Sequence, residues 1–365
     1  MCDAAQSSQA LRSRLIRDLS REFPAPAVTV ESLALQLGRL LDAGGDGLPL
    51  PGGGNTLERW RALADVAGHD LGLAKLFEGH TDALAIAGEW KAQRYLPTDG
   101  RIGMWAAEPP FAKVAIEEDP SGSGDRSCGQ PVRLVGRKAW CSGAPVLSHA
   151  LITAWQGERQ RLVLVELDQP GVTIDNEGWQ AVGMAATASV DVRFDDARGT
   201  LIGPPGGYLQ RPGFWHGGAG IAACWFGGAR RLAGCLQAKA SSRGDPHLYA
   251  HLGAVDVALA SAAALLRESA QWIDANPRRD AWLVAERTRA KVEQVVEQVI
   301  HHCGRGLGAG PYCRDPAFAR MVADLPVYVR QSHAEHDLEG IGRHVAVGEK
   351  THAPLSASEA SPWEL

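Results

Sequence analysis

Residues 135–155 bring together side chains that could hold a flat ring. Trp140 stands two residues before Ser142, with Cys141 between them, and a basic turn at 136–138 precedes all three. A large aromatic ring beside a small hydroxyl can lie against a flat ligand and donate one hydrogen bond to its edge. The alternating apolar run at 150–155 predicts a β-strand with one buried face. The pair therefore predicts a cofactor wall; the alternative is a core Trp and a turn hydroxyl that bonds its own backbone.

A second group of reactive side chains lies near the C-terminal end. His333, His336 and Asp337 follow each other at i, i+3 and i+4, so a helix would place them on one face. A neutral imidazole with a carboxylate partner is a suitable general base near neutral pH. The alternative is an exposed, charged helix face. We expect no metal site, because two imidazoles would need a third ligand that nothing in the sequence specifies.

The composition excludes several classes of protein. The 365 residues are 45% hydrophobic and 22% charged, as in ordinary globular proteins, and the net charge of −5 does not favour nucleic acid as a partner. Seven scattered cysteines without a CxxC pair argue against a disulfide framework, so we expect a reduced, cytoplasmic location. No apolar stretch approaches 18 residues, and we therefore expect no signal peptide and no membrane span.

The pattern of the chain changes twice. Residues 1–96 predict helices, 97–204 predict short strands separated by turn clusters, 205–347 predict helices again, and 348–365 form a polar tail. Within the last helical part we predict a helix over about 282–302, a break at 304–310 and a final helix over about 316–345. The fold class expected is α+β, mostly α, with an N-terminal helical domain, a middle β-barrel or sandwich and a C-terminal helical bundle.

This order, together with five local motifs, resembles the acyl-CoA dehydrogenase superfamily of FAD-dependent flavoproteins over roughly residues 30–345. The motifs are MWAAEP at 104–109, RKAWCS at 137–142, GMAATASVDVRFDD at 183–196, the helix at 222–232 and HHCGRGLGAG at 301–310. The resemblance implies a helical domain, a β-barrel and a four-helix bundle.

The resemblance also implies FAD and the residues that hold it. Trp140 would stack near the isoalloxazine, and Ser142 would bond its N5 or O4 edge. Arg243, at the start of the second bundle helix, would pair with the pyrophosphate of a neighbouring subunit's flavin, which requires a homodimer or homotetramer. The full set of cofactor contacts implied is Met104, Trp105, Ala107, Trp140, Cys141, Ser142, Arg243, His301, Gly304 and Gly306.

The chain departs from the family where the dehydrogenation base should be. Family members supply a Glu either near the end of the bundle or early in its first helix, and these positions fall at about Ser332 and near Gly217. Neither is a carboxylate. The catalytic candidates near the first position are Ser332, His333, Glu335 and His336. Residues 110–113 also lack the family's loop over the pantetheine, which weakens the case for a CoA thioester.

Three functions remain open. The first is an FAD-dependent dehydrogenase acting on an acyl thioester or related small molecule, with an electron-transfer flavoprotein or another electron acceptor. The second is a monooxygenase of the same fold that receives reduced flavin from a partner flavin reductase; relatives of that kind also lack the Glu and often place a His or Ser there. The third is a catalytically degenerate subunit.

Overall fold

The computed structural model describes residues 13–117, 127–175 and 177–347 of the chain. Residues 13–22 are helical and are followed by three helices, α2 (Val30–Asp42), α3 (Thr56–His69) and α4 (Leu71–Glu89). The strands are β1 (Ile102–Trp105), β2 (Val114–Ile116), β3 (Pro131–Cys141), β4 (His149–Gln156), β5 (Arg159–Glu166), β6 (Val172–Asp175) and β7 (Val190–Ile202). The remaining helices are α5 (Gly213–Arg243), α6 (Pro246–Ala275), α7 (Trp282–Leu307), α8 (Ala309–Arg314), α9 (Pro316–Tyr328) and α10 (Glu335–Val347).

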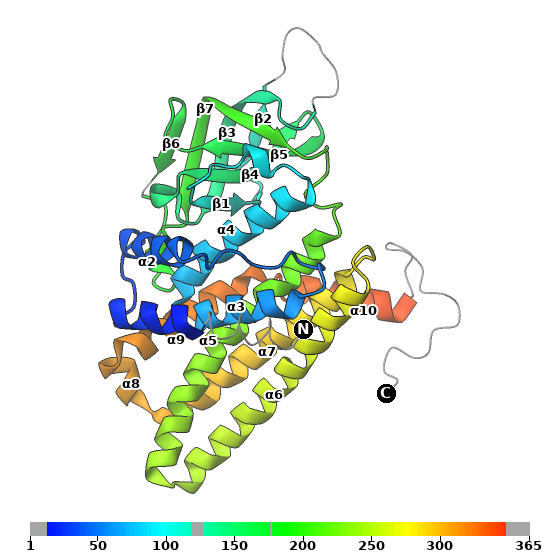
Figure 1. Cartoon of the computed structure of the whole chain (residues 1–365). Coiled ribbons are helices and arrows are strands. Elements are labelled where there is room, and N and C mark those ends of the chain that lie inside the picture. Colours follow the sequence, from blue (N-terminus) through cyan, green and yellow to red (C-terminus); the bar gives the residue numbers. More distant parts are fainter. Residues whose placement is uncertain (1–12, 118–126, 176, 348–365) are drawn as a thin grey trace.

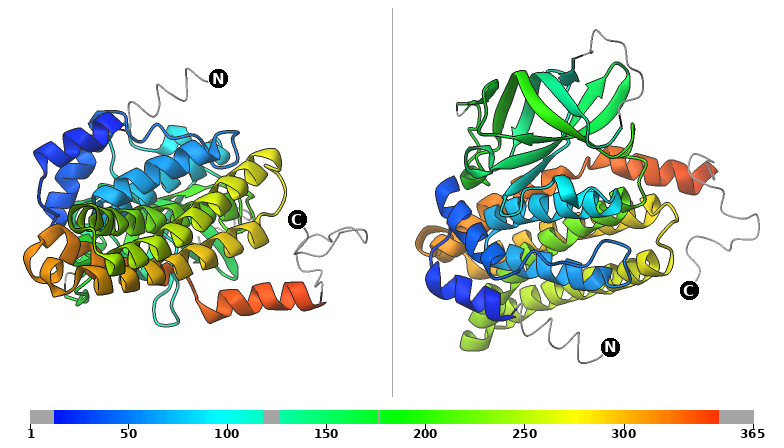
Figure 2. Two further views of the ribbon diagram at one scale, coloured as in Figure 1. Left: turned by 90° about the horizontal axis from the view of Figure 1, so that it is seen from below. Right: turned by 45° about the horizontal axis from the view of Figure 1, so that its top comes forward.

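The predicted fold class is confirmed. The structure is a mostly helical α+β protein with N-terminal helices, a middle β-barrel and a C-terminal helical domain, as in the acyl-CoA dehydrogenase fold. The barrel lies at one end of the molecule, and the long helices α5, α6 and α7 pack side by side at the other (Figure 1). Helix α4 lies between them and packs against β1 (Figures 1 and 2).

The barrel closes because β5 pairs on both of its edges. The sheet has the order β1-β4-β2-β3-β7-β5, and β5 also pairs with β4, which completes the ring. Alternating apolar residues in the sequence predict strands around 132–134, 151–154, 162–167 and 190–194. These coincide with β3, β4, β5 and β7, except that β5 ends at Glu166. The three strands that the sequence did not predict, β1, β2 and β6, are only three or four residues long. Such short runs give too little alternation to recognise.

Two predicted helix boundaries are wrong. Helix α7 does not end near residue 302 but continues to Leu307. It ends at Gly308, inside the break predicted over 304–310, and the φ of 65° at this residue is one that only glycine adopts without strain. The single helix predicted over 316–345 is two helices, α9 and α10, separated by a short 3₁₀ turn, Val329–Gln331, and an extended residue, Ser332. Ser332 leaves the helix to donate a hydrogen bond to Glu293 at 2.5 Å.

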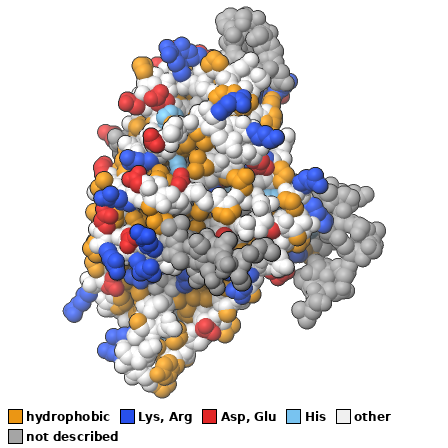
Figure 3. Space-filling view, in the orientation of Figure 1, with side chains coloured by type: hydrophobic (Ala, Val, Ile, Leu, Met, Phe, Trp, Pro, Cys, Tyr) orange, Lys and Arg blue, Asp and Glu red, His pale blue; other side chains and the backbone are white. Residues whose placement is uncertain are grey.

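Helix α6 is apolar beyond what the core requires. It contains an 18-residue window with a mean hydropathy of 1.5, so by length and composition alone it could cross a membrane. Only 22% of this window is buried inside the protein. Among the described residues it is the one helix that passes this test, and helices of soluble proteins pass it as well. Figure 3 shows hydrophobic side chains on the lower part of the molecule, where Figure 1 places α6.

Candidate active site

The wall predicted from Trp140 and Ser142 lies at the end of β3. The register between β3 and β7 shifts between Lys138 and Cys141, and at this bulge Trp140 takes a φ of 58°. Its side chain is 53% exposed and meets the exposed ring of Phe111 edge to face, with 6.3 Å between the ring centroids. The bulge therefore turns a large aromatic ring out of the barrel, onto a surface that suits a flat ligand.

Ser142 begins a chain of three hydroxyl groups. Its Oγ lies 2.7 Å from Ser189 Oγ, which lies 2.8 Å from Thr187 Oγ1, and Thr187 donates to the Met184 carbonyl at 2.8 Å. Each hydroxyl has one proton, so the last bond fixes the direction of the other two: Ser189 donates to Thr187, and Ser142 donates to Ser189. With this order Ser142 can accept a further hydrogen bond but has no proton left to donate.

Backbone strain is concentrated around the same residues. Among the described non-glycine residues, six have a positive φ, and three of these are Trp140, Met184 and Ala188. A fourth, Ala334, lies in the segment that carries the predicted catalytic residues. Non-glycine residues in this region cost free energy and tend to occur at functional sites, so the clustering marks this end of the barrel as a candidate site.

Two other predicted cofactor contacts lie behind the wall. Trp105 is buried, and its Nε1 donates to the Ser142 carbonyl at 3.2 Å, so it supports the wall. Cys141 is fully buried, with its thiol donating to the Lys138 carbonyl, which leaves only its backbone able to reach a ligand. Met104 and Ala107, on β1 and just after it, are partly exposed.

The loop after β1 is held by Glu108. Thr153 Oγ1 donates to Glu108 at 2.5 Å, the buried ammonium of Lys138 lies 3.3 Å away, and Trp155 Nε1 donates to its other oxygen at 3.0 Å. Partial burial acts to raise the pKa of Glu108, but the Thr153 bond and the Lys138 charge outweigh it, so this pKa lies below its usual value. Glu108 is therefore a structural anion that fixes the loop.

The C-terminal group gathers around Asp337. Its Oδ1 lies 3.3 Å from His333 Nδ1 and 3.8 Å from His336 Nδ1, and its Oδ2 accepts from the His333 backbone N–H. The side chains of His333 and His336 are 78% and 88% exposed. The expected triad therefore forms, but at the N-terminus of α10 and facing solvent. Glu335 is also exposed, whereas Ser332 is buried against Glu293.

Arg289 joins the two positions at which the family would place its base. From α7, its guanidinium donates to the Gly218 carbonyl at 3.1 Å and to the Gln331 carbonyl at 2.7 Å, and it stacks over Trp225 at 5.0 Å. The neighbourhoods of Gly217 and Ser332, far apart in sequence, are thus adjacent in space. Burial lowers the pKa of Arg289, and the carboxylate of Glu286 opposes this shift.

Sequence reasoning missed a buried polar cluster on α4. Asp82 lies 3.8 Å from Arg211, Glu89 lies 3.0 Å from the same guanidinium, and Glu78 accepts from the Tyr328 hydroxyl at 2.8 Å. The signal was available: Glu78 and Asp82 are four residues apart in a largely apolar helix, where acidic residues need partners.

Three aromatic rings continue from this cluster. Tyr208 meets Phe214 edge to face at 5.2 Å, and Phe214 meets Trp215 at 4.9 Å. All three are partly exposed although they lie where α5 begins, beside the buried Arg211. An aromatic strip next to buried charges is a suitable wall for a small organic ligand.

The remaining predicted contacts lie at the far ends of the long helices. Arg243 is the exposed last residue of α5, not the start of α6 as predicted. Gly304 and Gly306 lie within α7, where a side chain would meet the Tyr312 hydroxyl at 2.6 Å and the Leu236 side chain at 2.8 Å. Their small size therefore serves helix packing, and the helix ends only after them, at Gly308. His301 is exposed on the same helix.

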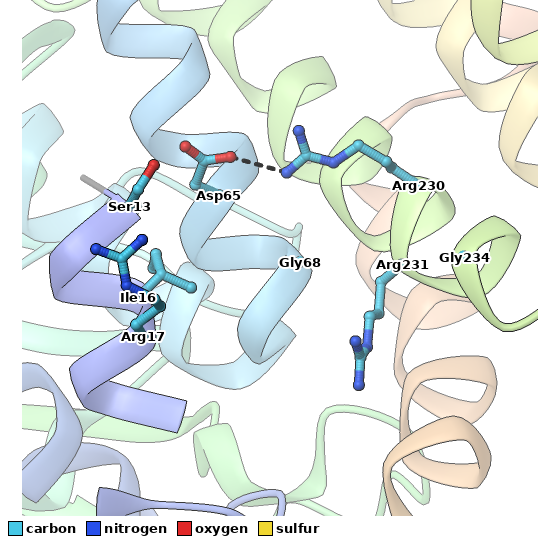
Figure 4. A pocket seen from close by; sticks show the side chains of 8 residues that line it. All are labelled: Ser13, Ile16, Arg17, Asp65, Gly68, Arg230, Arg231 and Gly234. Atoms are coloured by element: carbon cyan, nitrogen blue, oxygen red, sulfur yellow. Dashed lines mark hydrogen bonds and ion pairs between the residues drawn. The ribbon is translucent and has the colours of Figure 1, made fainter. Parts of the chain in front are cut away.

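A surface depression of about 430 Å³ lies elsewhere on the protein, between the helix at 13–22, α3 and α5. Figure 4 shows Arg230 reaching Asp65 across it, at 2.8 Å, while Arg231 points away from this pair. None of the residues predicted for the cofactor or for catalysis lines this depression.

Comparison with known proteins supports the fold. No protein-family model matches the chain, and no curated protein sequence matches it. Several solved structures match the chain in fold. FMN-bound TdsC from Paenibacillus sp. A11-2 has a TM-score of 0.77 and 17% identity, over 95% of this chain and 98% of that one. KijD3 with FMN and a dTDP-linked amino sugar has a TM-score of 0.76 and 20% identity, over 93% and 94%. The nitrososynthase of Micromonospora carbonacea var. africana has a TM-score of 0.77 and 17% identity, over 93% and 96%.

Proposed function

We propose that this protein is a flavin-dependent monooxygenase that receives reduced flavin from a separate reductase. One observation carries the proposal: Trp140 and Ser142 offer an aromatic ring and a hydroxyl that suit a flavin, while neither position of the family's dehydrogenation base holds a carboxylate. Gly217 has no side chain, and Ser332 is turned to Glu293. The similar structures include a dibenzothiophene monooxygenase and a methanesulfinate monooxygenase, which supports this reading over the dehydrogenase.

The hydroxyl chain favours reduced flavin. Bound reduced flavin would supply the two electrons with which O₂ is split. Its N5 carries a hydrogen, whereas N5 of oxidised flavin only accepts. Ser142, whose own proton is committed to Ser189, can accept from a reduced ring and cannot donate to an oxidised one. This reverses the donor role that the sequence suggested for Ser142.

FMN suits the chain better than the FAD that the resemblance implies. Two of the similar structures, those of TdsC and KijD3, contain FMN. The glycines expected to approach the diphosphate, Gly304 and Gly306, lie inside α7 beneath Tyr312 and Leu236. The substrate in this proposal is a small organic molecule held near Tyr208, Phe214 and Trp215, and a cytoplasmic location next to the reductase is part of the proposal.

The test of this function uses reduced FMN, ¹⁸O₂ and a panel of indole, dibenzothiophene, methanesulfinate and an amino-sugar nucleotide. We expect ¹⁸O in one product, detected by mass spectrometry. In parallel, an anaerobic panel of acyl-CoA thioesters should leave the oxidised flavin coloured. Bleaching by an acyl-CoA without oxygen transfer would favour the dehydrogenase, and failure to bind any flavin would favour the degenerate subunit.

Ser142→Ala is expected to weaken the binding of reduced FMN by about fivefold, because one net hydrogen bond contributes roughly 1 kcal/mol. Oxidised FMN should bind almost as in the parent protein. Anaerobic fluorescence titration gives both dissociation constants. Ser148→Ala, whose hydroxyl donates to the Arg101 carbonyl, is the matched control. An equal loss of affinity for oxidised and reduced FMN would contradict the donor direction from Ser142 through Ser189 to Thr187.

The catalytic candidates are tested one at a time. Replacing His333, Glu335 and His336 singly by alanine is expected to give at least one variant that binds FMN normally and no longer oxygenates its substrate. Because Asp337 contacts both histidines, Asp337→Asn should weaken the same activity. Full activity in all three alanine variants would remove this segment from the reaction.

The oligomer expected from the resemblance, a homodimer or homotetramer, has a candidate surface on α6. Gly253, Val257, Ala260 and Ala264 recur at helical spacing and are exposed, with Val257 at 71%. We expect Val257→Glu to reduce the molar mass measured by light scattering, because a buried charge opposes association. Asp256→Asn is the control, and an unchanged mass for Val257→Glu would place the interface elsewhere.

A further inference from the structure

The position that a base would take on α5 is filled from another helix. Gly217 lies on α5, close to where the resemblance places the alternative carboxylate. A Cβ built on Gly217 would lie 3.3 Å from Oδ1 of Asp82, which belongs to α4. The space that a side chain from position 217 would enter is therefore the space that the Asp82 carboxylate already occupies.

Asp82 also has the surroundings of a reactive group. The Asp82 side chain is 29% accessible, so it is largely buried and still within reach of a small molecule. Arg211 lies 3.8 Å away, and Gly218, next to Gly217, is bonded to Arg289. Asp82 therefore lies next to the point at which the two expected base positions meet.

We propose that Asp82 is the proton-transfer group on the substrate side of the active site, supplied by α4 in place of a carboxylate from α5 or from the Ser332 segment. This assignment rests on the proposed monooxygenase function. In that reaction substrate, O₂ and the two electrons and two protons of reduced flavin give an oxygenated product, water and oxidised flavin. Asp82 donates its proton to the oxygen atom that leaves as water, and recovers a proton from solvent.

The charges around Asp82 fit a carboxyl that holds its proton. Burial raises the pKa of Asp82 above its usual value, the positive charges of Arg211 and Arg59 oppose this shift, and Glu78 on the same helix adds to it; Lys75 opposes it weakly. Raising the pH through this pKa removes the proton. Activity that needs protonated Asp82 is therefore expected to decrease as the pH rises.

The experiment measures the oxidation of protein-bound reduced FMN by O₂, with indole as probe, between pH 5.5 and 9. The parent protein should lose rate as the pH rises. Asp82→Asn should be slower by on the order of 100-fold at low pH and show no such dependence, because positioned proton donors contribute at this level. Asp65 lies on α3 and is ion-paired with Arg230 of α5, and Asp65→Asn should keep the parent profile.

A second variant, in which the carboxylate moves from position 82 to position 217, distinguishes loss of the proton donor from a folding defect. Asp82→Ala with Gly217→Asp returns a carboxylate to the same place from α5, and it should recover part of the rate and the pH dependence. A parent-like profile for Asp82→Asn overturns the assignment of Asp82. So does an exchange variant that binds FMN with parent affinity and recovers nothing. If the parent protein itself binds no FMN, the proposed function fails, and Asp82 fails with it.

Discussion

Glu286→Gln is expected to remove a large part of the pH dependence of stability. Burial, with the nearby charge of Asp337, raises the pKa of Glu286 to about 7, while Arg289 and His336 oppose the shift. Its Oε2 is buried and has no hydrogen-bond partner among the described residues. In the unfolded chain this carboxyl titrates near its ordinary value, so its contribution is fully present at acid pH and is lost as the pH rises towards 7.

The expected size is about 3 kcal/mol, from roughly 1.4 kcal/mol per pKa unit. Glu286→Gln should equal the parent protein near pH 4.5 and exceed it in free energy of unfolding above pH 7. Urea titrations at both pH values measure the difference. The raised pKa of Asp324, about 6, is common to both proteins and cancels. Glu297→Gln, an exposed residue of the same helix, is the control, and an equal pH dependence in parent and Glu286→Gln would show that Glu286 is not buried as described.

Arg289→Ala is expected to destabilise the protein by about 3–5 kcal/mol, because it leaves buried partners without their cation. Two carbonyls, those of Gly218 and Gln331, would lose a charged donor, and Trp225 would lose a stacked guanidinium. Urea unfolding gives the loss, and limited proteolysis between 330 and 337 should accelerate, since this segment loses one of its contacts with α7 and keeps that of Ser332 with Glu293.

Arg287→Ala is the matched control, because Arg287 is a partly exposed neighbour on the same helix. Arg289→Lys should recover only part of the stability, since an ammonium cannot reproduce the fork that reaches two carbonyls. An Arg289→Ala protein that unfolds at the parent's urea concentration would mean that the contacts of Arg289 contribute nothing net.

Much of the fold followed from local pattern. The apolar stripe at Val292, Val295, Val296 and Val299 predicted α7, and alternation of apolar residues predicted β3, β4, β5 and β7. Each of these elements has a buried face, so its apolar residues recur in the sequence with the period of a helix or a strand. The end of α7 did not follow. Gly304 is a residue type that commonly ends helices. The structure shows that it lies inside α7, where the Tyr312 hydroxyl packs against it and leaves no space for a side chain.

The site was predictable on one side only. Trp140 and Ser142 lie in one short segment, so their motif could be recognised in sequence. Asp82, Gly217 and Arg289 come from three helices that are far apart in the sequence. The spacing of residues along the chain therefore could not predict that they lie close together. The direction of the proton chain from Ser142 also depends on Ser189 and Thr187, which are nearly fifty residues away, and it became visible only once their distances were known.

The closure of the barrel bears on how this protein behaves at high concentration. Among the described strands, only β1 and β6 have a single neighbour, and each is four residues long. Open edges of longer strands are the surfaces on which sheets of separate molecules join into aggregates. Because β5 closes the ring, little backbone is left for such pairing, and self-association should proceed through helix surfaces, where it can stop at a defined size.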